Sequence, residues 1–357
     1  MRAARVVLLA ALLVVAAGAC GDDGGSSDDS GSGGDDVTLR LAAYDSFLLS
    51  DATLQQFTAD TGIEVETVIG GDAGEVVNRA VLNKGKPEGD VLWGVDNTLL
   101  SRAVDQGIFV PYESPELANV DPAFTALVPG HEATPVDYGD VCVNYDKAWF
   151  EDEGIEPPST LESLTDPQYK DLLVVENPAT SSPGLAFLLA TIARFGPDGW
   201  QGYWEDLRAN GVEAVNGWTE AYSTEFSGSS GKGPKPLVVS YASSPPAEIV
   251  FATDPKPTEP PTGVVTDGCF RQVEFAGILE GTKHEEEARQ LVDYMLSDTW
   301  QADIPLNMFV YPVRQGVALP EVFSLSSVPD APLSVPPEEI DANREAWIKA
   351  WTDTVLR

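Results

Sequence analysis

From residue 37 onward, short apolar runs rich in β-branched residues alternate with longer segments whose apolar positions follow a helical period. The runs at 37–44, 63–69 and 90–95 are predicted as strands, and the segments at 51–62, 74–85 and 97–108 as helices. This alternation with short connections is typical of a parallel sheet flanked by helices. Because ligands bind beyond the carboxyl ends of strands in such sheets, we single out the polar residues at 44–46, 70–72 and 96–97.

The pattern changes in the middle of the chain. Residues 134–146 form a predicted strand without a helix on either side, and residues 267–279 form a second long strand. Predicted helices at 186–195 and 199–210 and a strand at 236–242 lie between them, and helices at 285–297 and 338–356 follow. We interpret the two long strands as neighbours that cross between two lobes. The predicted first lobe comprises residues 37–138 and 272–357, and the second lobe comprises residues 139–271.

The first 36 residues have the pattern of an export signal followed by a polar segment, which predicts a location outside the cytoplasm. Arg2 and Arg5 precede an apolar run at 6–19, which is shorter than the roughly 20 residues that span a bilayer but suits the core of a signal peptide. Small residues stand directly before Cys20, and this resembles a bacterial lipobox, in which the cysteine is lipidated. Residues 21–36 are all Gly, Ser or Asp, which favours a flexible tether. We therefore expect a lipoprotein signal peptide at 1–20 and anchoring to the outer face of the cell membrane.

Charge and the remaining titratable residues narrow the function. A formal net charge of −36 argues against nucleic acid and anionic membrane surfaces as partners, because both require basic patches. The two histidines, His131 and His284, lack the spacing of metal ligands. Cys142 and Cys269 lie on the two crossing strands, and an oxidising compartment favours a disulfide between them. The alternative is a free, reactive thiolate at Cys142.

Eight short blocks follow one another along residues 37–357: YDSF (44–47), GVDNTLL (94–100), VDYGDVCVNYDK (136–147), ATSSPGLAFLL (179–189), NGWTEAY (216–222), LVVSYASSP (237–245), VYPV (310–313) and AWIKAW (346–351). In this order they resemble the thiamine-binding substrate-binding proteins of bacterial ABC transporters, a branch of the type II periplasmic-binding-protein class. The resemblance implies an α/β fold with two lobes, each a mixed sheet flanked by helices, and a ligand cleft between the lobes. It implies no cofactor and no enzymatic activity, with an ABC transporter permease as partner.

The resemblance also implies the ligand-binding residues. The matching positions are Asp72, Ala73, Ser181, Ser182, Trp218, Tyr241, Ala242, Ser243 and Ser244, with Tyr44 and Tyr222 as nearby pocket residues. Asp96 is a further candidate because it ends a predicted strand, although capping of the following helix explains it equally well. The pattern departs from that of the family at Ala247 and Phe309, where the family can carry tyrosine and tryptophan.

These residue types suit a flat, permanently positive ligand such as thiamine or thiamine phosphate. Trp218 and Tyr222 are four residues apart, so they share one face of a helical turn, and an aromatic face attracts a cation. Asp72 is the first candidate for a carboxylate that faces the thiazolium or accepts from the aminopyrimidine. Ser181 and Ser182 open a helix, whose N-terminus suits a hydroxyl or phosphate tail.

Two alternatives stay open at this point. One is a thiaminase-like enzyme that uses Cys142 as its nucleophile, which requires an unpaired thiol. The other is a protein that binds a different small cationic or heteroaromatic solute in the same cleft.

Overall fold

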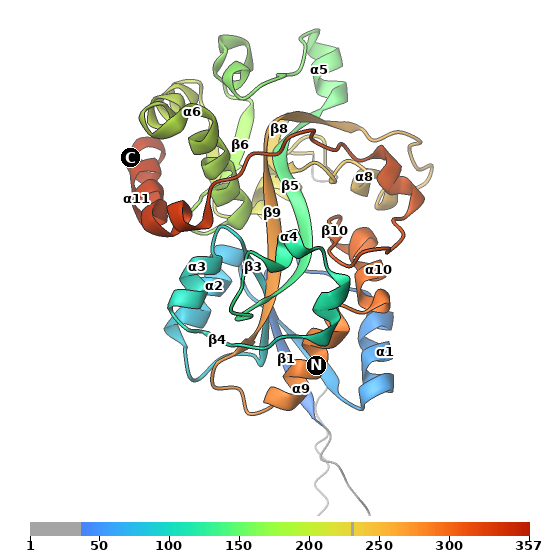
Figure 1. The fold of residues 1–357 in the computed structure, drawn as a ribbon. Coiled ribbons are helices and arrows are strands. Elements are labelled where there is room, and N and C mark those ends of the chain that lie inside the picture. The colour runs from blue at the N-terminus through green and yellow to red at the C-terminus, as the bar shows by residue number, and fades with distance from the viewer. Residues whose placement is uncertain (1–36, 230–231) are drawn as a thin grey trace, which may run out of the picture. The chain divides into compact units, whose positions relative to one another are not determined.

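The computed structural model describes residues 37–229 and 232–357 (Figure 1). The predicted signal peptide at 1–20, the lipidation site Cys20 and the predicted tether at 21–36 lie outside the described residues. Among the described residues, ten strands form one mixed sheet. Eight of them follow the order β2-β1-β3-β9-β5-β8-β6-β7, and the other two, the short strands β4 and β10, pair with β9 and β5.

One side of this sheet, which we call the β1 side, confirms the βα alternation that the sequence predicts. Its strands are parallel: β1 (Thr38–Ala43), β2 (Glu64–Ile69) and β3 (Val91–Asp96). Its helices are α1 (Asp51–Thr61), α2 (Ala73–Leu82) and α3 (Leu100–Asp105). Local signals fix the ends of α1, since the Ser50 side chain accepts from the Thr53 N–H and Gly62 closes the helix at a φ of 77°.

Two long antiparallel strands, β5 (Thr134–Asp146) and β9 (Thr262–Leu279), run side by side through the middle of the sheet (Figure 1). Their pairing places Cys142 and Cys269 next to each other, with Cα atoms 4.4 Å apart, and the two residues form a disulfide. The predictions that the two long strands are neighbours and that a disulfide joins them are both confirmed. The short strands β4 (Phe109–Val110) and β10 (Tyr311–Pro312) extend this central pair.

The other side of the sheet, the β6 side, begins with β8 (Leu237–Tyr241), which is antiparallel to β5. Two parallel strands follow, β6 (Leu173–Glu176) and β7 (Glu213–Val215). The helices of this side are α5 (Lys147–Glu153), α6 (Ser182–Ala209), α7 (Trp218–Glu220) and α8 (Ala247–Val250). The two helices predicted at 186–195 and 199–210 form one element, α6, which is kinked where Gly196 takes a φ of 70° before Pro197.

The remaining helices lie before β5 and after β9 in the chain. They are α4 (Pro122–Thr125), α9 (Glu285–Met295), α10 (Asp298–Asn307) and α11 (Pro337–Val355). Short 3₁₀ turns occur at Pro115–Asn119, Glu162–Thr165, Pro167–Tyr169 and Glu321–Leu325, and a π turn at Ala221–Glu225.

The C-terminal helix α11 contacts both sides of the sheet. Trp351 packs edge-on against Trp204 of α6, with ring centroids 5.5 Å apart, and Arg344 donates to Ser101 of α3. The sequence assigned this helix to the first lobe alone. The lobe boundaries at 37–138, 139–271 and 272–357 stay a prediction, because the compact unit that contains them is continuous from residue 36 to 357.

Two hydrophobic clusters hold the helices on the sheet. The larger one joins α2, α3, α6 and α11 to the sheet, and its most buried side chains include Phe187, Trp204 and Trp351. The other joins α1, α9 and α10 to the sheet around Trp93 and Trp300, whose rings stack at 5.9 Å. Each cluster excludes water from a face of the sheet and so stabilises the position of the strand ends.

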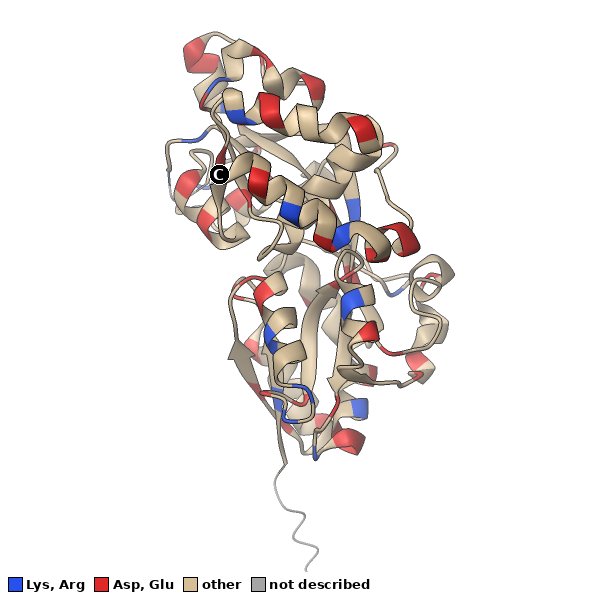
Figure 2. Cartoon of the chain, turned by 90° about the vertical axis from the view of Figure 1, so that its left-hand side faces the viewer, with Lys and Arg blue, Asp and Glu red and all other residues tan. Residues whose placement is uncertain are grey.

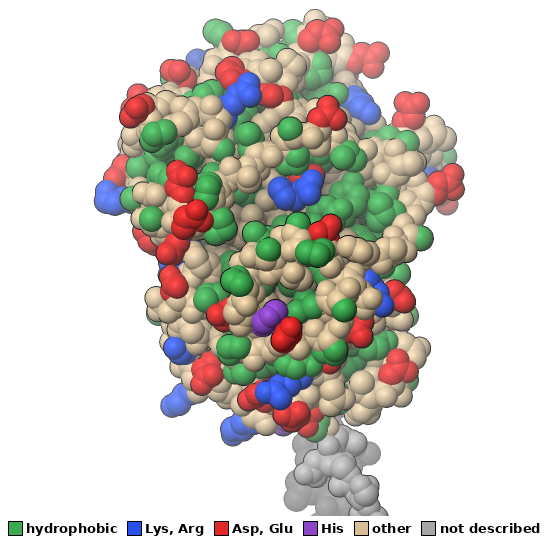
Figure 3. Space-filling view, in the orientation of Figure 1, with side chains coloured by type: hydrophobic (Ala, Val, Ile, Leu, Met, Phe, Trp, Pro, Cys, Tyr) green, Lys and Arg blue, Asp and Glu red, His purple; other side chains and the backbone are tan. Residues whose placement is uncertain are grey.

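Acidic residues are spread over the helices, and the fewer Lys and Arg residues lie among them rather than in one basic area of the ribbon (Figure 2). The face in Figure 3 mixes both signs with apolar side chains. Among the described residues, no helix combines the length and the apolar character that a membrane span requires.

The disulfide generates a prediction about stability. Cys142 and Cys269 are separated by 127 residues, and a crosslink over so long a loop stabilises a protein by up to about 5 kcal/mol in the chain-entropy account. We expect the double variant Cys142→Ser/Cys269→Ser to lose about 3–5 kcal/mol in free energy of unfolding, measured by urea denaturation of residues 37–357. A reductant should lower the stability of the wild type to the same level and leave the double variant unchanged. Equal stability with and without the disulfide would contradict this expectation.

Candidate functional site

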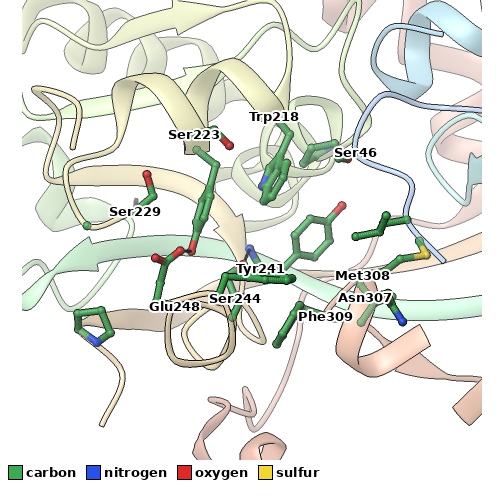
Figure 4. Close-up of a pocket in the computed structure, with 18 of the residues that line it drawn as sticks. Ser46, Trp218, Ser223, Ser229, Tyr241, Ser244, Glu248, Asn307, Met308 and Phe309 are labelled. Carbon is green, nitrogen blue, oxygen red and sulfur yellow. Dashed lines mark hydrogen bonds between the residues drawn. The ribbon is translucent and has the colours of Figure 1, made fainter. Parts of the chain in front are cut away.

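A cavity of about 950 Å³ opens where the β1 side, the β6 side and the central strands meet. Its walls come from the segment after β1, the N-termini of α2 and α6, the α7 turn, the ends of β8 and α10, and the loop at 251–261. Figure 4 shows side chains from these elements converging on one space. The volume lies at the upper end of the range for small-molecule sites.

Trp218 and Tyr222 form one aromatic wall of this cavity. Their rings stack with centroids 4.9 Å apart and an interplanar angle of 12°, as the four-residue spacing predicts. The Trp218 indole N–H donates to Ser240 Oγ at 2.9 Å, which fixes the plane of the ring. Trp218 is half-buried whereas Tyr222 is 6% exposed, so the tryptophan is the member of the pair with surface left for a ligand.

Further aromatic side chains face the same space. Tyr241 at the end of β8 and Tyr44 after β1 are half-buried, and Phe309 follows α10 (Figure 4). Phe309 has a φ of 54°, which is uncommon for a bulky side chain. The Ser243 hydroxyl donates to the Phe309 carbonyl at 2.5 Å and holds this loop in place. Backbone conformations of this kind concentrate at functional sites.

Asp72 joins the two sides of the sheet below the aromatic wall. Its Oδ1 accepts from the Ala73 N–H at 2.6 Å and from the Ser182 N–H at 3.2 Å, and its Oδ2 accepts from the Trp218 N–H at 2.9 Å. Burial raises the pKa of Asp72 to about 6, although these hydrogen bonds oppose the shift. Asp72 was the first candidate from the sequence for a carboxylate that faces the cation. In the structure it already accepts hydrogen bonds from three backbone N–H groups, at the starts of α2, α6 and α7.

Other carboxyl groups are buried in or beside the cavity. Glu274 and Glu248 line it, and Glu248 accepts from the Tyr222 hydroxyl at 2.9 Å. Burial raises the pKa of Glu274 well above its usual range, and the neighbouring Asp137 raises it further. Burial also raises the pKa of Glu248. Among the described residues, none of the ion pairs includes these three groups or Asp72.

The cavity lining is therefore acidic. Four of its described side chains carry carboxyl groups, Asp72, Asp146, Glu248 and Glu274, against one cationic side chain, Lys232. An acidic cavity with aromatic walls favours a flat cation over an anion, because a buried carboxylate is stabilised by an opposite charge.

Asp96 does not line the cavity. It is fully buried at the end of β3, where Oδ1 accepts from the backbone and hydroxyl of Thr98 and from the Leu99 N–H. Asp96 therefore holds the turn at 97–99 that precedes α3, and it is not the N-cap of that helix. Its Oδ2 accepts from the side-chain amide of Gln272.

Gln272 connects this buried group to the cavity. Its amide N–H also donates to Ser182 Oγ at 3.0 Å, and its carbonyl accepts from the Tyr241 hydroxyl at 2.6 Å. The orientation of the Tyr241 ring is thereby set by a chain of hydrogen bonds that reaches back to β3.

The structure divides the sequence-predicted residues into two groups. Those that line the cavity are Tyr44, Asp72, Ala73, Ser182, Trp218, Tyr222, Tyr241 and Ser244. Those that lie behind its walls are Asp96, Ser181, Ala242 and Ser243. Ser181 caps α6, with its hydroxyl accepting from the Gly184 N–H at 3.4 Å, and Ser243 holds the Phe309 loop. Their roles are therefore to position neighbours.

Sequence reasoning missed three polar residues at this site: Glu274, Gln272 and Asp137. A usable signal existed, because Gln272 and Glu274 are two residues apart in a buried strand and must share one face of the sheet. Phe251, Pro255 and Pro257 of the loop at 251–261 are exposed and also line the cavity. No local pattern indicates that a proline-rich loop folds over a pocket.

The fold and the cavity define an extracytoplasmic binding protein of the periplasmic-binding-protein class. A solved structure titled "Periplasmic thiamin binding protein" matches with a TM-score of 0.78 and 29% identity, over 90% of this chain and 96% of that chain. The chain belongs to the bacterial extracellular solute-binding proteins, whose family model matches residues 89–340.

Curated relatives agree with this membership. The thiamine-binding periplasmic protein of Salmonella typhimurium is 31% identical over 327 residues, which cover 89% of this chain and 94% of the relative. The thiamine-binding periplasmic protein of Brucella suis is 27% identical over 329 residues, 90% of this chain and 92% of the relative.

The disulfide argues against the alternative of a thiaminase-like enzyme with Cys142 as its nucleophile. Cys142 is bonded to Cys269, and a nucleophile of the thiaminase kind must be a free thiolate. In this state of the protein Cys142 cannot fill that role, and family membership points to binding rather than catalysis.

The contacts of Asp72 generate a prediction about the coupling of the two sides. In an Asp72→Asn variant, the amide NH₂ must face a backbone N–H of Ser182, Trp218 or Ala73, which leaves a donor unsatisfied. We expect the amide protons of Ser182 and Trp218 to exchange about 10–100 times faster, measured by hydrogen exchange with NMR detection. Glu75→Gln is the matched control, because Glu75 is exposed on the same helix turn and should leave exchange unchanged. Unaltered protection in Asp72→Asn would show that the carboxylate does not hold the sides together.

Proposed function

We propose that this solute-binding protein captures thiamine, or a phosphorylated or otherwise related form, and delivers it to an ABC transporter permease. The observation that carries the proposal is the cavity that joins a stacked Trp218–Tyr222 wall to buried carboxyl groups without cationic partners. The names of the Salmonella and Brucella relatives support the same ligand.

A thiazolium ring matches this lining on physical grounds. An aromatic face contributes about 0.5–2 kcal/mol to the binding of a cation, and the upper part of that range applies when water is excluded. Trp218 and Tyr241 supply half-buried rings from two different elements. The carboxyl groups lower the free energy of a permanent positive charge in this cavity, whereas an anionic solute would meet repulsion.

Ligand capture in this proposal includes a closing motion of the two sides about the central strands. Asp72 on α2 contacts Ser182 and Trp218 on the β6 side, and a Cβ added at Gly74 would lie 2.5 Å from the Thr180 carbonyl oxygen. Both contacts require the sides to be close together. A ligand that touches Tyr44 on one side and Trp218 on the other favours that arrangement by its differential affinity.

The proposal includes attachment to the outer face of the cell membrane. The support is the sequence of residues 1–36, with Cys20 as the lipidated residue, together with the extracellular character of the family. A tether of 16 residues lets the folded part move roughly 20–25 Å from the bilayer.

The first prediction of the proposal concerns Trp218. We expect Trp218→Ala to weaken thiamine binding by residues 37–357 at least tenfold, since the loss of one cation–π wall amounts to about 1.4 kcal/mol or more. Isothermal titration calorimetry measures the change, with thermal unfolding to confirm that the variant folds.

Trp347→Ala serves as the matched control, because this tryptophan is also half-buried but lies on α11, away from the cavity. The affinity of the Trp347→Ala variant for thiamine should equal that of the wild type. Wild-type protein that binds another small cationic solute but not thiamine would favour the alternative ligand class, and equal affinity of Trp218→Ala would exclude the stacking role.

The second prediction concerns anchoring. A Cys20→Ser variant, expressed in a bacterium that processes lipoproteins, should lose metabolic labelling by a radioactive fatty acid and leave the membrane fraction. Cys269→Ser is the control for a general effect of cysteine loss and should retain the label. Lipid labelling that persists in Cys20→Ser would contradict the proposed anchor.

A further inference from the structure

Two acidic residues face each other across the central strands. In the β5–β9 register, Asp137 is directly opposite Glu274, and the nearby pair on the same ladder is Asp140 opposite Arg271. The second pair is an ion pair, with Arg271 Nε 2.5 Å from Asp140 Oδ1. Neither Asp137 nor Glu274 forms an ion pair among the described residues. Like charges directly opposite each other destabilise a sheet unless one of them is neutralised.

The described residues around Asp137 and Glu274 provide hydrogen-bond donors to Glu274 but no basic side chain paired with either carboxyl group. Asp137 and Glu274 face each other and are both buried, and two ionised carboxylates side by side without a cation are unfavourable, so the pair holds a proton in the free protein. Glu274 Oε2 accepts from the Trp93 indole N–H at 2.6 Å and from the Tyr44 hydroxyl at 3.0 Å. Asp137 Oδ2 is buried without a hydrogen-bond partner, and Asp137 is 3% exposed.

The titratable groups packed around the pair are uncharged or acidic. Tyr44 after β1 and Tyr241 on β8 are close to both carboxyl groups, and Asp96 on β3 and Asp72 at the start of α2 are close to Tyr241. Arg271, the nearest basic residue on the ladder, is engaged with Asp140. Of the pair, Glu274 reaches the cavity lining, whereas Asp137 lies behind it.

We infer that Glu274 and Asp137 are a proton-loaded receptor for the positive charge of the ligand: entry of the cation into the cavity expels the shared proton to solvent and leaves both carboxylates ionised. The inference rests on the proposed function, since it requires a cationic ligand in this cavity. The reaction is a proton transfer from a carboxyl O–H to water or buffer, and one positive charge enters as one leaves. This exchange discriminates a cationic ligand from an uncharged ring of the same shape, because the uncharged ring cannot replace the positive charge of the proton.

The direction of the pH dependence follows from the free protein. Burial raises the pKa of Asp137 to about 7, and burial together with Asp137 raises that of Glu274 well above its usual range. A nearby cation lowers both pKa values, so the bound state holds fewer protons than the free state. Thiamine affinity must therefore rise as the pH increases toward neutrality, and level off once the free pair has lost its proton.

The test is calorimetry of residues 37–357 with thiamine at pH 7.0, in phosphate and in MOPS, whose ionisation enthalpies differ. The slope of the observed enthalpy against the buffer enthalpy gives the protons released. We expect about one proton per thiamine for the wild type, and a rise in affinity of at least fivefold from pH 5.5 to 7.5.

Two isosteric variants separate the two residues. Glu274→Gln removes the charge that meets the ligand, so affinity should fall at least tenfold and proton release should largely disappear. Asp137→Asn removes only the partner, so affinity at pH 7.5 should stay within about threefold of the wild type while proton release and pH dependence decrease. A purely structural role would instead weaken both variants alike and leave the number of released protons unchanged.

A second measurement does not depend on the variants. The infrared difference spectrum of the wild type should lose a carbonyl band of a buried protonated carboxyl when thiamine is added. Thiamine binding without proton release and without this band would overturn the inference while the proposed function stands. Absence of thiamine binding at every pH would overturn the proposed function, and the inference with it.

Discussion

The antiparallel pairing of β5 with β9 is the constraint on which the rest of the structure depends. These two strands are the only part of the central path that both sides of the sheet share, with β3 attached to β9 and β8 to β5. The disulfide between Cys142 and Cys269 fixes their register from within. Because each side is built on one of these strands, any motion of one side relative to the other must bend or twist this pair.

The same pairing sets the electrostatics of the cavity. One cross-strand pair, Asp140 with Arg271, is neutral as an ion pair, and the other, Asp137 with Glu274, places two acids opposite each other. The net charge of −36 says nothing about this difference, since few of the described acidic residues are buried. A few buried carboxyl groups, and not the total charge, are the basis of the preference for a cation that we propose.

Asp72 shows how one side chain can serve structure and function together. It caps α2 and accepts from the backbone of α6 and α7, so it marks the place where the two sides of the sheet meet. Tyr241 and Gln272 add a second connection, from the cavity wall to Asp96. These contacts are made by backbone N–H groups and amides, which have fixed directions, and they therefore orient Trp218 and Tyr241 before any ligand arrives.

The sequence by itself predicted the strands and helices of the β1 side and the shared face of Trp218 and Tyr222, because period, spacing and helix caps are local properties. It favoured a disulfide between Cys142 and Cys269 on neighbouring strands but left a free thiolate open. Only the tertiary structure decided which polar residues face the cavity. Asp96 is buried and holds the turn before α3, Ser243 donates to the Phe309 carbonyl, and Glu274 lines the cavity. The physical reason is that a side chain's partners come from segments distant in the chain: Asp137 meets Glu274 only because a sheet register brings them together.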